Sequence, residues 1–389
     1  MIHTKEPTMT NKLPFCLPAN MTPEIFLAEY WQKKPLLIKN GLPALVGMFE
    51  PTDVLDLATE DGVLARLITQ KDDNPNQWTL KNSPLSEDDL QNTPQLWTIL
   101  VQNLEQWSPE LGEMWQAFDF IPKWQQDDIM VSVASAGGSV GAHYDEYDVF
   151  LAQGYGTRRW SLGKMCHDDT PFIKAQPIRL LDDMGQIIFD EILEAGDVLY
   201  VPPRLSHHGV AQDDCLTFSF GFRRPNMVQI LDEMADVATG EHTLFSPLIL
   251  PQTLQNNAYQ LTDDSIHAIK NELISLINSD KGNAILTQAV SELVSKRQYD
   301  LIAFDDELSP NELSKRLQHG ECLMINPACR FVQQNDNWYI NGECICFNNK
   351  ELALIHRFTN NEVIGFDELD DELLVSGANW LNDNWLILI

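Results

Sequence analysis

The chain has 389 residues, which is too long for one ordinary hydrophobic core and predicts two or three domains. Its 44% of apolar residues and its ten tryptophans exclude a disordered protein. The formal net charge of -31 disfavours nucleic-acid binding and fits either simple solubility or a basic protein partner.

The distribution of apolar residues predicts a soluble protein, and its N-terminal residues predict a short extension before the first domain. No stretch is apolar for the length of a membrane span, and residues 1–6 carry no apolar signal core, so we expect a cytoplasmic protein with no membrane contact. Residues 1–20 are predicted to be a loose leader. The next domain is then expected to begin at residue 21.

Helices are predicted along much of the region that follows. Thr22 is a suitable N-cap and Pro23 a suitable first residue for a helix over 24–32. A short strand is expected at Leu36–Ile38, after Pro35. Residues 51–120 show mostly helical patterns, for example over 51–60 and 94–107.

From Asp128 onward the apolar pattern changes to the period of two that is typical of strands. Many short strands separated by Gly, Pro and Asp turns indicate a double-sheet jelly roll, also called a double-stranded β-helix. The mouth of such a barrel holds one small ligand or a metal, so residues 21–225 are predicted to form a catalytic domain. The expected strands lie at 130–133, 149–152, 159–162, 186–189, 198–201 and 216–222.

Two further domains are predicted after Pro225, which gives an α+β protein. Residues 226–298 contain three helical patterns, at 226–237, 263–277 and 283–296, without clustered catalytic residue types. Such a bundle packs on the main domain or on a second copy, and we expect a homodimerisation domain.

Residues 299–389 show a helix after Ser309, a hairpin around 335–337 and a helix over 350–358, an order that resembles a winged helix. From residue 301 onward there are 5 Lys and Arg against 15 Asp and Glu, so we expect a protein contact or a structural role and no direct DNA binding.

Three residues predict a metal site. His143 and Asp145 are two apart, so on a strand they project from one face. His207 follows a turn, an apolar strand and the pair Pro202-Pro203. Two imidazoles and one carboxylate form the ligand set of non-haem Fe(II) oxygenases, although Zn²⁺ accepts the same set. The structural alternative is that His143 is a core histidine bonded to Asp145 and that His207 is a loop residue.

At these residues the chain resembles the JmjC/cupin-type 2-oxoglutarate oxygenases, and in particular the bacterial ribosomal oxygenases. The stretches that carry the resemblance are 30–38, 143–150, 153–160 and the segment from Pro202-Pro203 to Gly221-Phe222-Arg223. The resemblance implies Fe(II), 2-oxoglutarate as cosubstrate and dioxygen. It also implies hydroxylation of an arginine, at the β-carbon, in a basic ribosomal protein of the large subunit.

A cation inside the barrel is needed to bind the distal carboxylate of 2-oxoglutarate, and Arg158 is the candidate because its guanidinium can bind a carboxylate bidentately. The resemblance supports this position. Ser132 matches a position of the family that lines the cosubstrate pocket, and Thr217 and Ser219 are similar candidates. All four can instead be structural. Arg159 and His208 are expected to face away from the site.

Substrate recognition is less specific in the sequence. Aromatic rings and carboxylates suit a guanidinium guest, although the same residues can pack the barrel. The residues concerned are Tyr144, Glu146, Tyr147 and Tyr155.

Two other functions remain open at this level. One is a cupin-type metal-dependent dioxygenase or isomerase that acts on a small metabolite. The other is a metal-free binding module or transcription factor that uses the winged helix. Neither alternative requires both the three metal-ligand candidates and Arg158, so the presence of all four residues favours the 2-oxoglutarate oxygenase.

Overall fold

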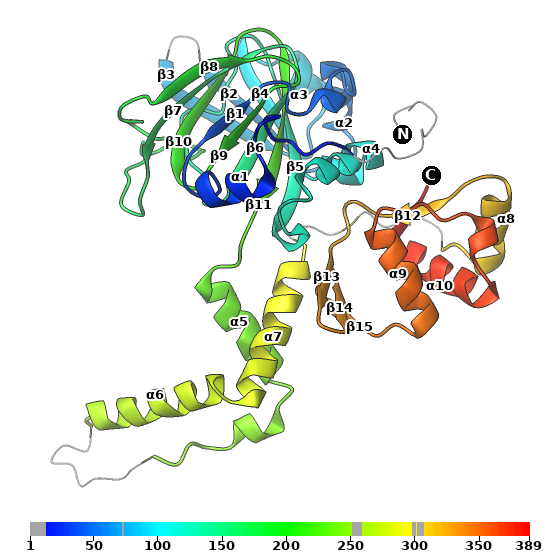
Figure 1. The fold of residues 1–389 in the computed structure, drawn as a ribbon. Helices are drawn as coiled ribbons and strands as arrows, with labels where there is room; N and C mark the ends of the chain where they lie inside the picture. The colour runs from blue at the N-terminus through cyan, green and yellow to red at the C-terminus, as the bar shows by residue number, and fades with distance from the viewer. Residues whose placement is uncertain (1–12, 72–73, 251–258, 298–300, 302–306) are drawn as a thin grey trace. The chain divides into compact units, whose positions relative to one another are not determined.

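The computed structural model describes residues 13–71, 74–250, 259–297, 301 and 307–389 (Figure 1). Most of the predicted leader, residues 1–12, therefore lies outside the described residues, while Cys16 is fully buried in the core. The chain forms two compact units. The first contains the residues up to Arg223 together with 300–329 and 353–389, and the second contains 224–299 and 330–352. Within the described ranges, no helix is long and apolar enough to cross a membrane.

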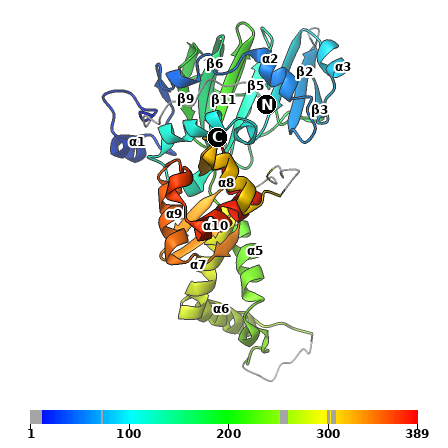
Figure 2. The same cartoon turned by 90° about the vertical axis from the view of Figure 1, so that its right-hand side faces the viewer.

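The first unit is built on two antiparallel sheets, which confirms the predicted jelly roll. The larger sheet has eight strands in the order β1-β9-β6-β11-β5-β4-β2-β3. Figure 2 labels β9, β6, β11, β5, β2 and β3 across this sheet. Its strands are β1 (Leu36–Ile38), β2 (Ala65–Lys71), β3 (Asn74–Asn82), β4 (Leu96–Val101), β5 (Gln126–Ala134), β6 (Asp148–Tyr155), β9 (Val198–Val201) and β11 (Cys215–Phe222). The smaller sheet has the order β10-β7-β8 and consists of β7 (Arg158–Met165), β8 (Phe189–Leu193) and β10 (Leu205–Ala211).

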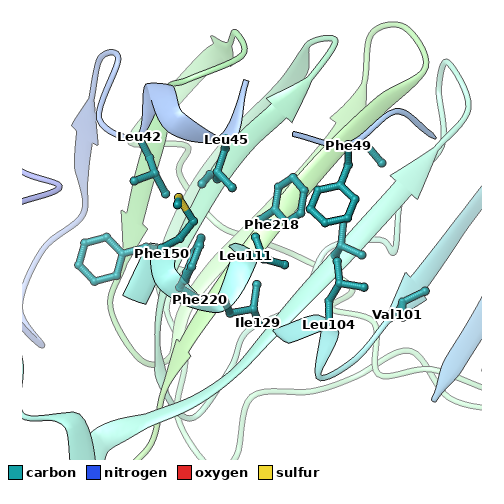
Figure 3. Packing of buried hydrophobic residues seen from close by; sticks show 14 of the residues in the cluster. Leu42, Leu45, Phe49, Val101, Leu104, Leu111, Ile129, Phe150, Phe218 and Phe220 are labelled. Carbon is teal, nitrogen blue, oxygen red and sulfur yellow. The ribbon is translucent and has the colours of Figure 1, made fainter. Parts of the chain in front are cut away.

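Alternation along the strands separates two cores on the two faces of the larger sheet. On the outer face, Phe150, Phe218 and Phe220 pack with residues from the N-terminal helical segments, and Figure 3 shows Phe218 beside Phe49. On the inner face, Val149 and Leu151 pack with side chains of the smaller sheet. The helical segments on the outer side are α1 (Pro23–Glu29), α2 (Pro51–Leu57), α3 (Glu87–Gln91), α4 (Pro109–Gly112) and the 3-10 turns η1 (Pro43–Leu45), η2 (Leu104–Gln106), η3 (Glu113–Phe118) and η4 (Lys123–Gln125).

The prediction that residues 51–120 are mostly helical is wrong. Only α2 matches its expected position, and the region contributes β2, β3 and β4 to the larger sheet. The pattern over 94–107 is β4 followed by the turn η2. The misleading feature is β4, whose last four residues, 98–101, are all buried, because a strand that is buried on both faces has no alternation and cannot be distinguished from a buried helix by its period. The strand expected at 186–189 also lies further along the chain, as β8.

The second unit contains the three predicted helices, α5 (Met227–Ala238), α6 (Asp263–Ile277) and α7 (Asp280–Ser295). Helix α7 packs against α5 and also against the sheet formed by β13 (Phe331–Gln334), β14 (Asn337–Ile340) and β15 (Glu343–Ile345) (Figure 1). The predicted hairpin of the winged helix therefore belongs to the same compact unit as the helices. Lys296 pairs with the buried carboxylate of Glu233, which ties the end of α7 to α5.

The remaining C-terminal elements are α8 (Pro310–Gln318), β12 (Leu323–Ile325), α9 (Asn349–Thr359), the turn η6 (Phe366–Glu368), α10 (Asp371–Asn382) and β16 (Leu386–Leu388). Helices α8 and α10 pack together, and β12 pairs with β16. Helix α8 begins after Ser309, as the sequence predicts, and Ser309 forms a capping box with Glu312. Helix α10 and the strands β15 and β16 are elements that the sequence patterns did not predict.

Candidate metal centre

The two segments that carry the predicted metal ligands are joined by a pair of backbone hydrogen bonds. The His143 amide donates to the His207 carbonyl at 3.0 Å, and the His207 amide donates to the His143 carbonyl at 2.8 Å. His207 lies on β10, which the sequence analysis did not predict. His143 forms only an isolated bridge, so the expected regular strand under His143 and Asp145 is wrong. The strand after this segment is β6, and Arg158 begins β7.

This bridge brings three potential ligand atoms together. One nitrogen or oxygen atom from each of His143, Asp145 and His207 lies within 4.8 Å of the other two. The carboxylate of Asp145 is 3.6 Å from Nε2 of His207, and the two imidazole centroids are 4.2 Å apart. Among the described residues this is the one such cluster of His, Cys, Asp and Glu side chains.

Hydrogen bonds prepare both imidazoles for a metal ion. Nδ1 of His143 lies 2.9 Å from the carbonyl of Gly141, and Nδ1 of His207 lies 2.9 Å from the carbonyl of Leu205. A carbonyl only accepts, so each Nδ1 carries the proton and each Nε2 keeps a free lone pair. His207 is 2% exposed, and burial, together with the neighbouring His143, lowers the pKa of His207 to about 4. The imidazole is therefore neutral at physiological pH, which is the form that binds metals.

A bulge in β10 decides which of the two adjacent histidines faces the barrel. The register of β10 against β7 shifts between Leu205 and His207, after which His207 pairs with Leu162 and His208 with Ser161. Leu162 is part of the core between the sheets, whereas Ser161 donates to Asp190 on the exposed face. His208 accordingly lies outside the cluster of three ligand candidates.

Arg204 stabilises the loop that carries Asp145. Its amide donates to the Asp145 carbonyl at 2.7 Å, and its guanidinium pairs with Glu146 and Asp168, each at 2.7 Å. Glu146 is therefore already bound to a cation of its own chain, and Tyr144 stacks on Phe172 with ring centroids 5.5 Å apart. Tyr155 is exposed at the end of β6. The ring of Tyr147 also contacts a cation of this chain, the guanidinium of Arg223, which shows that a guanidinium fits against it.

Arg158 is directed into the barrel and is 4% exposed, while Arg159 pairs with Asp190 on the outer face, as expected. Nη1 of Arg158 donates to Oγ of Ser132 at 2.9 Å. Nε and Nη2 are buried and have no acceptor among the residues that the structure describes. Thr217 is occupied by Gln153, to which it donates at 2.8 Å. Arg158 and Ser132 are thus brought together, and the guanidinium lacks a carboxylate.

A carboxylate-rich corner lies on the same face of the larger sheet. Asp128, Met130 and Ser132 alternate with the outward-facing core residues of β5, so their side chains face inward. The negative charge of Asp145, burial and the charge of Asp128 raise the pKa of Tyr147 well above its usual value. Burial and the neighbouring carboxylates of Asp127 and Glu105 raise the pKa of Asp128.

The guanidinium of Arg223 lies 4.7 Å from the centre of the Tyr147 ring and forms an ion pair with Asp127. This corner therefore combines an aromatic ring with carboxylates at a place that already accommodates a guanidinium. The sequence analysis missed Asp128, although the period of two that it used for β5 places Asp128 on the face of Ser132.

The fold and the geometry define a jelly-roll protein with an H-x-D…H cluster and a buried arginine inside the barrel. The JmjC domain family matches residues 113–230, and the ROXA-like winged helix family matches residues 275–386. A probable ribosomal oxygenase of Haemophilus influenzae is 44% identical, over 98% of this chain and 100% of that protein. The ribosomal protein uL16 3-hydroxylase of Escherichia coli is 31% identical, over 82% of this chain and 84% of that protein.

Solved structures agree with these relatives. The X-ray structure of E. coli YcfD has a TM-score of 0.82 and 26% identity, and the match covers 95% of this chain and 99% of that one. A structure of the same E. coli ribosomal oxygenase in complex with cobalt and 2-oxoglutarate has a TM-score of 0.79, with the same coverage. The chain belongs to the ribosomal oxygenase family, with a JmjC domain followed by a winged helix.

Substitution of any one of His143, Asp145 and His207 by Ala is expected to weaken the binding of Co²⁺ by at least about a hundredfold, because changes even to the partners of metal ligands cost 10–100-fold. Isothermal titration calorimetry of the metal-free protein measures this. His208→Ala is the matched control, since His208 is the next residue on the same strand, and it should retain the wild-type affinity. Wild-type affinity in His207→Ala would refute the site.

Proposed function

We propose that this protein is an Fe(II)- and 2-oxoglutarate-dependent oxygenase that hydroxylates the β-carbon of an arginine in a large-subunit ribosomal protein. The E. coli relative is named a ribosomal protein uL16 3-hydroxylase, and uL16 is accordingly the proposed substrate here. The observation that carries the proposal is the buried guanidinium of Arg158, which has no carboxylate partner among the described residues and lies in the same barrel as the three candidate metal ligands.

Each residue of the site has a role that follows from its geometry. His143, Asp145 and His207, whose ligand atoms lie together, would hold the ion, and three protein ligands would leave positions for the cosubstrate and dioxygen. Fe(II) with 2-oxoglutarate and dioxygen supplies the oxidant that converts an unactivated C–H bond into C–OH. The interior of the barrel, where Arg158 and His207 are buried, would limit the access of water to this centre, and its side chains would orient the two substrates.

Arg158 is proposed to bind the distal carboxylate of 2-oxoglutarate, with Ser132 holding the guanidinium in place. Buried donors without acceptors cost about 1–3 kcal/mol each, and more when charged, so a guanidinium with two such nitrogens favours an anionic guest. A carboxylate matches the fork of an arginine in two parallel hydrogen bonds. A metabolite dioxygenase or isomerase that uses the metal without a 2-oxo acid leaves this arginine without a partner.

The substrate arginine is proposed to bind between Tyr147 and Asp128. A guanidinium favours the face of an aromatic ring and a carboxylate at its edge, and Arg223 already makes this pair of contacts with Tyr147 and Asp127. Tyr147 is two residues from Asp145, and the charges of Asp145 and Asp128 both raise its pKa. The corner is therefore adjacent to the proposed metal.

The charge of the chain suits a basic protein substrate. The sequence carries 57 acidic against 26 basic residues, which attracts a basic polypeptide before specific docking. The same charge opposes contact with nucleic-acid phosphates, so the winged helix is proposed to contact protein.

Arg158→Ala is expected to raise the Michaelis constant for 2-oxoglutarate by at least about a hundredfold, because loss of a buried partner leaves the carboxylate uncompensated at a cost of several kcal/mol. Arg159→Ala is the matched control: its side chain lies on the other face of β7 and its removal should leave the constant within about twofold. An unchanged Michaelis constant in Arg158→Ala would favour the metabolite-dioxygenase alternative.

The substrate assignment is tested by mass spectrometry of ribosomal proteins from cells with and without this protein. We expect one arginine of uL16 to be heavier by one oxygen atom only when the protein is present, and fragmentation should place that oxygen on the β-carbon. Complementation with His207→Ala should leave the arginine unmodified. An identical arginine mass in all three strains would contradict the proposal.

We also propose that the second unit mediates a homodimer. Helix α6 is amphipathic but buries none of its residues in this chain. Several of its apolar side chains are exposed, and the first turns of α5 expose others. Apolar faces of this size on neighbouring helices suit a second copy of the same chain. The exposed residues are Met227, Val228, Leu231, Ile266, Leu273, Ile274 and Ile277.

Light scattering of the full-length protein at micromolar concentration is expected to give about twice the chain mass of 44.2 kDa. Leu273→Glu on α6 should shift the mass to that of one chain, because a buried charge opposes the interface. Ile192→Glu, which changes an exposed isoleucine of β8 in the other unit, is the control and should leave the dimer intact. A monomeric wild-type protein would refute the idea.

A further inference from the structure

Trp160 is a buried side chain to which the proposed function gives no role. It is 4% exposed, and its indole nitrogen has no acceptor among the described residues. On β7 it alternates with Arg158 and Leu162, so all three side chains face the interior of the barrel. The unpaired nitrogens of Arg158 and Trp160 thus belong to neighbouring side chains on one strand face.

The indole ring lies close to both parts of the site. The guanidinium carbon of Arg158 is 5.9 Å from the centre of the Trp160 ring, and the centre of the His207 ring is 6.0 Å from it. A 2-oxo acid that reaches from Arg158 to the metal ligands therefore passes beside Trp160.

The backbone opposite Trp160 fixes the ring. Trp160 pairs with Gly209 on β10, and a Cβ at position 209 would lie 2.7–2.8 Å from three atoms of its six-membered ring. The glycine therefore leaves the space that the indole occupies, and the ring is held in place before any ligand binds. A donor that is fixed in this way loses little conformational entropy when it makes a hydrogen bond.

The free-energy cost of an unpaired indole N–H indicates which kind of ligand would remove that cost. A buried donor without an acceptor costs about 1–3 kcal/mol, and an apolar ring of similar shape would avoid that cost. The neighbouring unpaired donors of Arg158 call for an anion. A dicarboxylate offers more oxygen atoms than Arg158 and the metal together can use, so one remains for the indole.

We propose that the indole N–H of Trp160 donates a hydrogen bond to a carboxylate oxygen of bound 2-oxoglutarate, so that Trp160 and Arg158 together select the cosubstrate. This inference rests on the proposed function. It assigns to Trp160 a direct contact with the cosubstrate in addition to its place in the core between the sheets.

Trp160→Phe tests the contact because it keeps an aromatic ring and removes the N–H. We expect the dissociation constant for 2-oxoglutarate, measured by calorimetry on the Zn²⁺-loaded protein, to rise about five- to tenfold. The affinity for Zn²⁺ should not change. Trp115→Phe is the matched control: Trp115 is also buried, but it packs with Phe118 and Phe220 on the other face of the larger sheet, and its loss should leave 2-oxoglutarate binding unchanged.

A second measurement does not depend on the variant. The ten tryptophans give ten indole N–H resonances in the ¹⁵N-labelled protein, and one should move downfield when 2-oxoglutarate is added to the Zn²⁺-loaded wild type. That resonance should be missing in Trp160→Phe.

The outcomes distinguish the two proposals. If 2-oxoglutarate binds the wild type but no indole resonance moves downfield, the Trp160 contact is wrong. The contact is also wrong if wild type and Trp160→Phe bind 2-oxoglutarate with affinities that agree within twofold. It is wrong as well if the variant loses as much affinity for Zn²⁺ as for 2-oxoglutarate. If the wild type does not bind 2-oxoglutarate at all, the proposed function itself fails.

Discussion

The site depends on the two backbone hydrogen bonds between His143 and His207. They join a loop to a strand that is distant in the sequence, and they set the distance between the two imidazoles. Each imidazole is then oriented by a carbonyl two residues before it, from Gly141 and from Leu205. The backbone thus supplies both the spacing and the tautomers of the proposed ligands. Loss of this bridge would separate the ligands even if all three side chains were intact.

The inner faces of the two sheets contribute different side chains to the barrel. The larger sheet offers polar side chains from β5 and β11, such as Ser132 and Thr217, beside the apolar residues of β6. The smaller sheet contributes Arg158, Trp160 and His207 from two neighbouring strands. Because Arg158 reaches across to Ser132, the two sheets meet through a polar contact inside an otherwise apolar core. A buried charge in this place is costly without a guest, which ties the stability of the empty barrel to its function.

The proposed substrate site and the cosubstrate site carry opposite charges: the first is negative and the second is positive. Around Arg158 the barrel presents donors without an acceptor, which suits an anion. Around Tyr147 it presents carboxylates from Asp127, Asp128 and Asp145, which suits a cation. Two substrates of opposite charge can therefore occupy one barrel without competing for the same groups.

Residue identity and spacing were enough to predict the jelly roll and the opposite directions of Arg158 and Arg159, because strand alternation is a local property. The three ligand candidates were found from their residue types and order, although the strand expected under His143 and Asp145 did not form. Other features needed the tertiary structure. The burial of β4 removed the alternation that would have marked it as a strand, so the region before the barrel was wrongly predicted to be helical. The strand β10 was missed because its pairing with β7 and the bulge at Ser206 arise only when distant segments meet. For the same reason only the folded chain brings the indole of Trp160 close to both Arg158 and His207, and its N–H has no acceptor among the described residues.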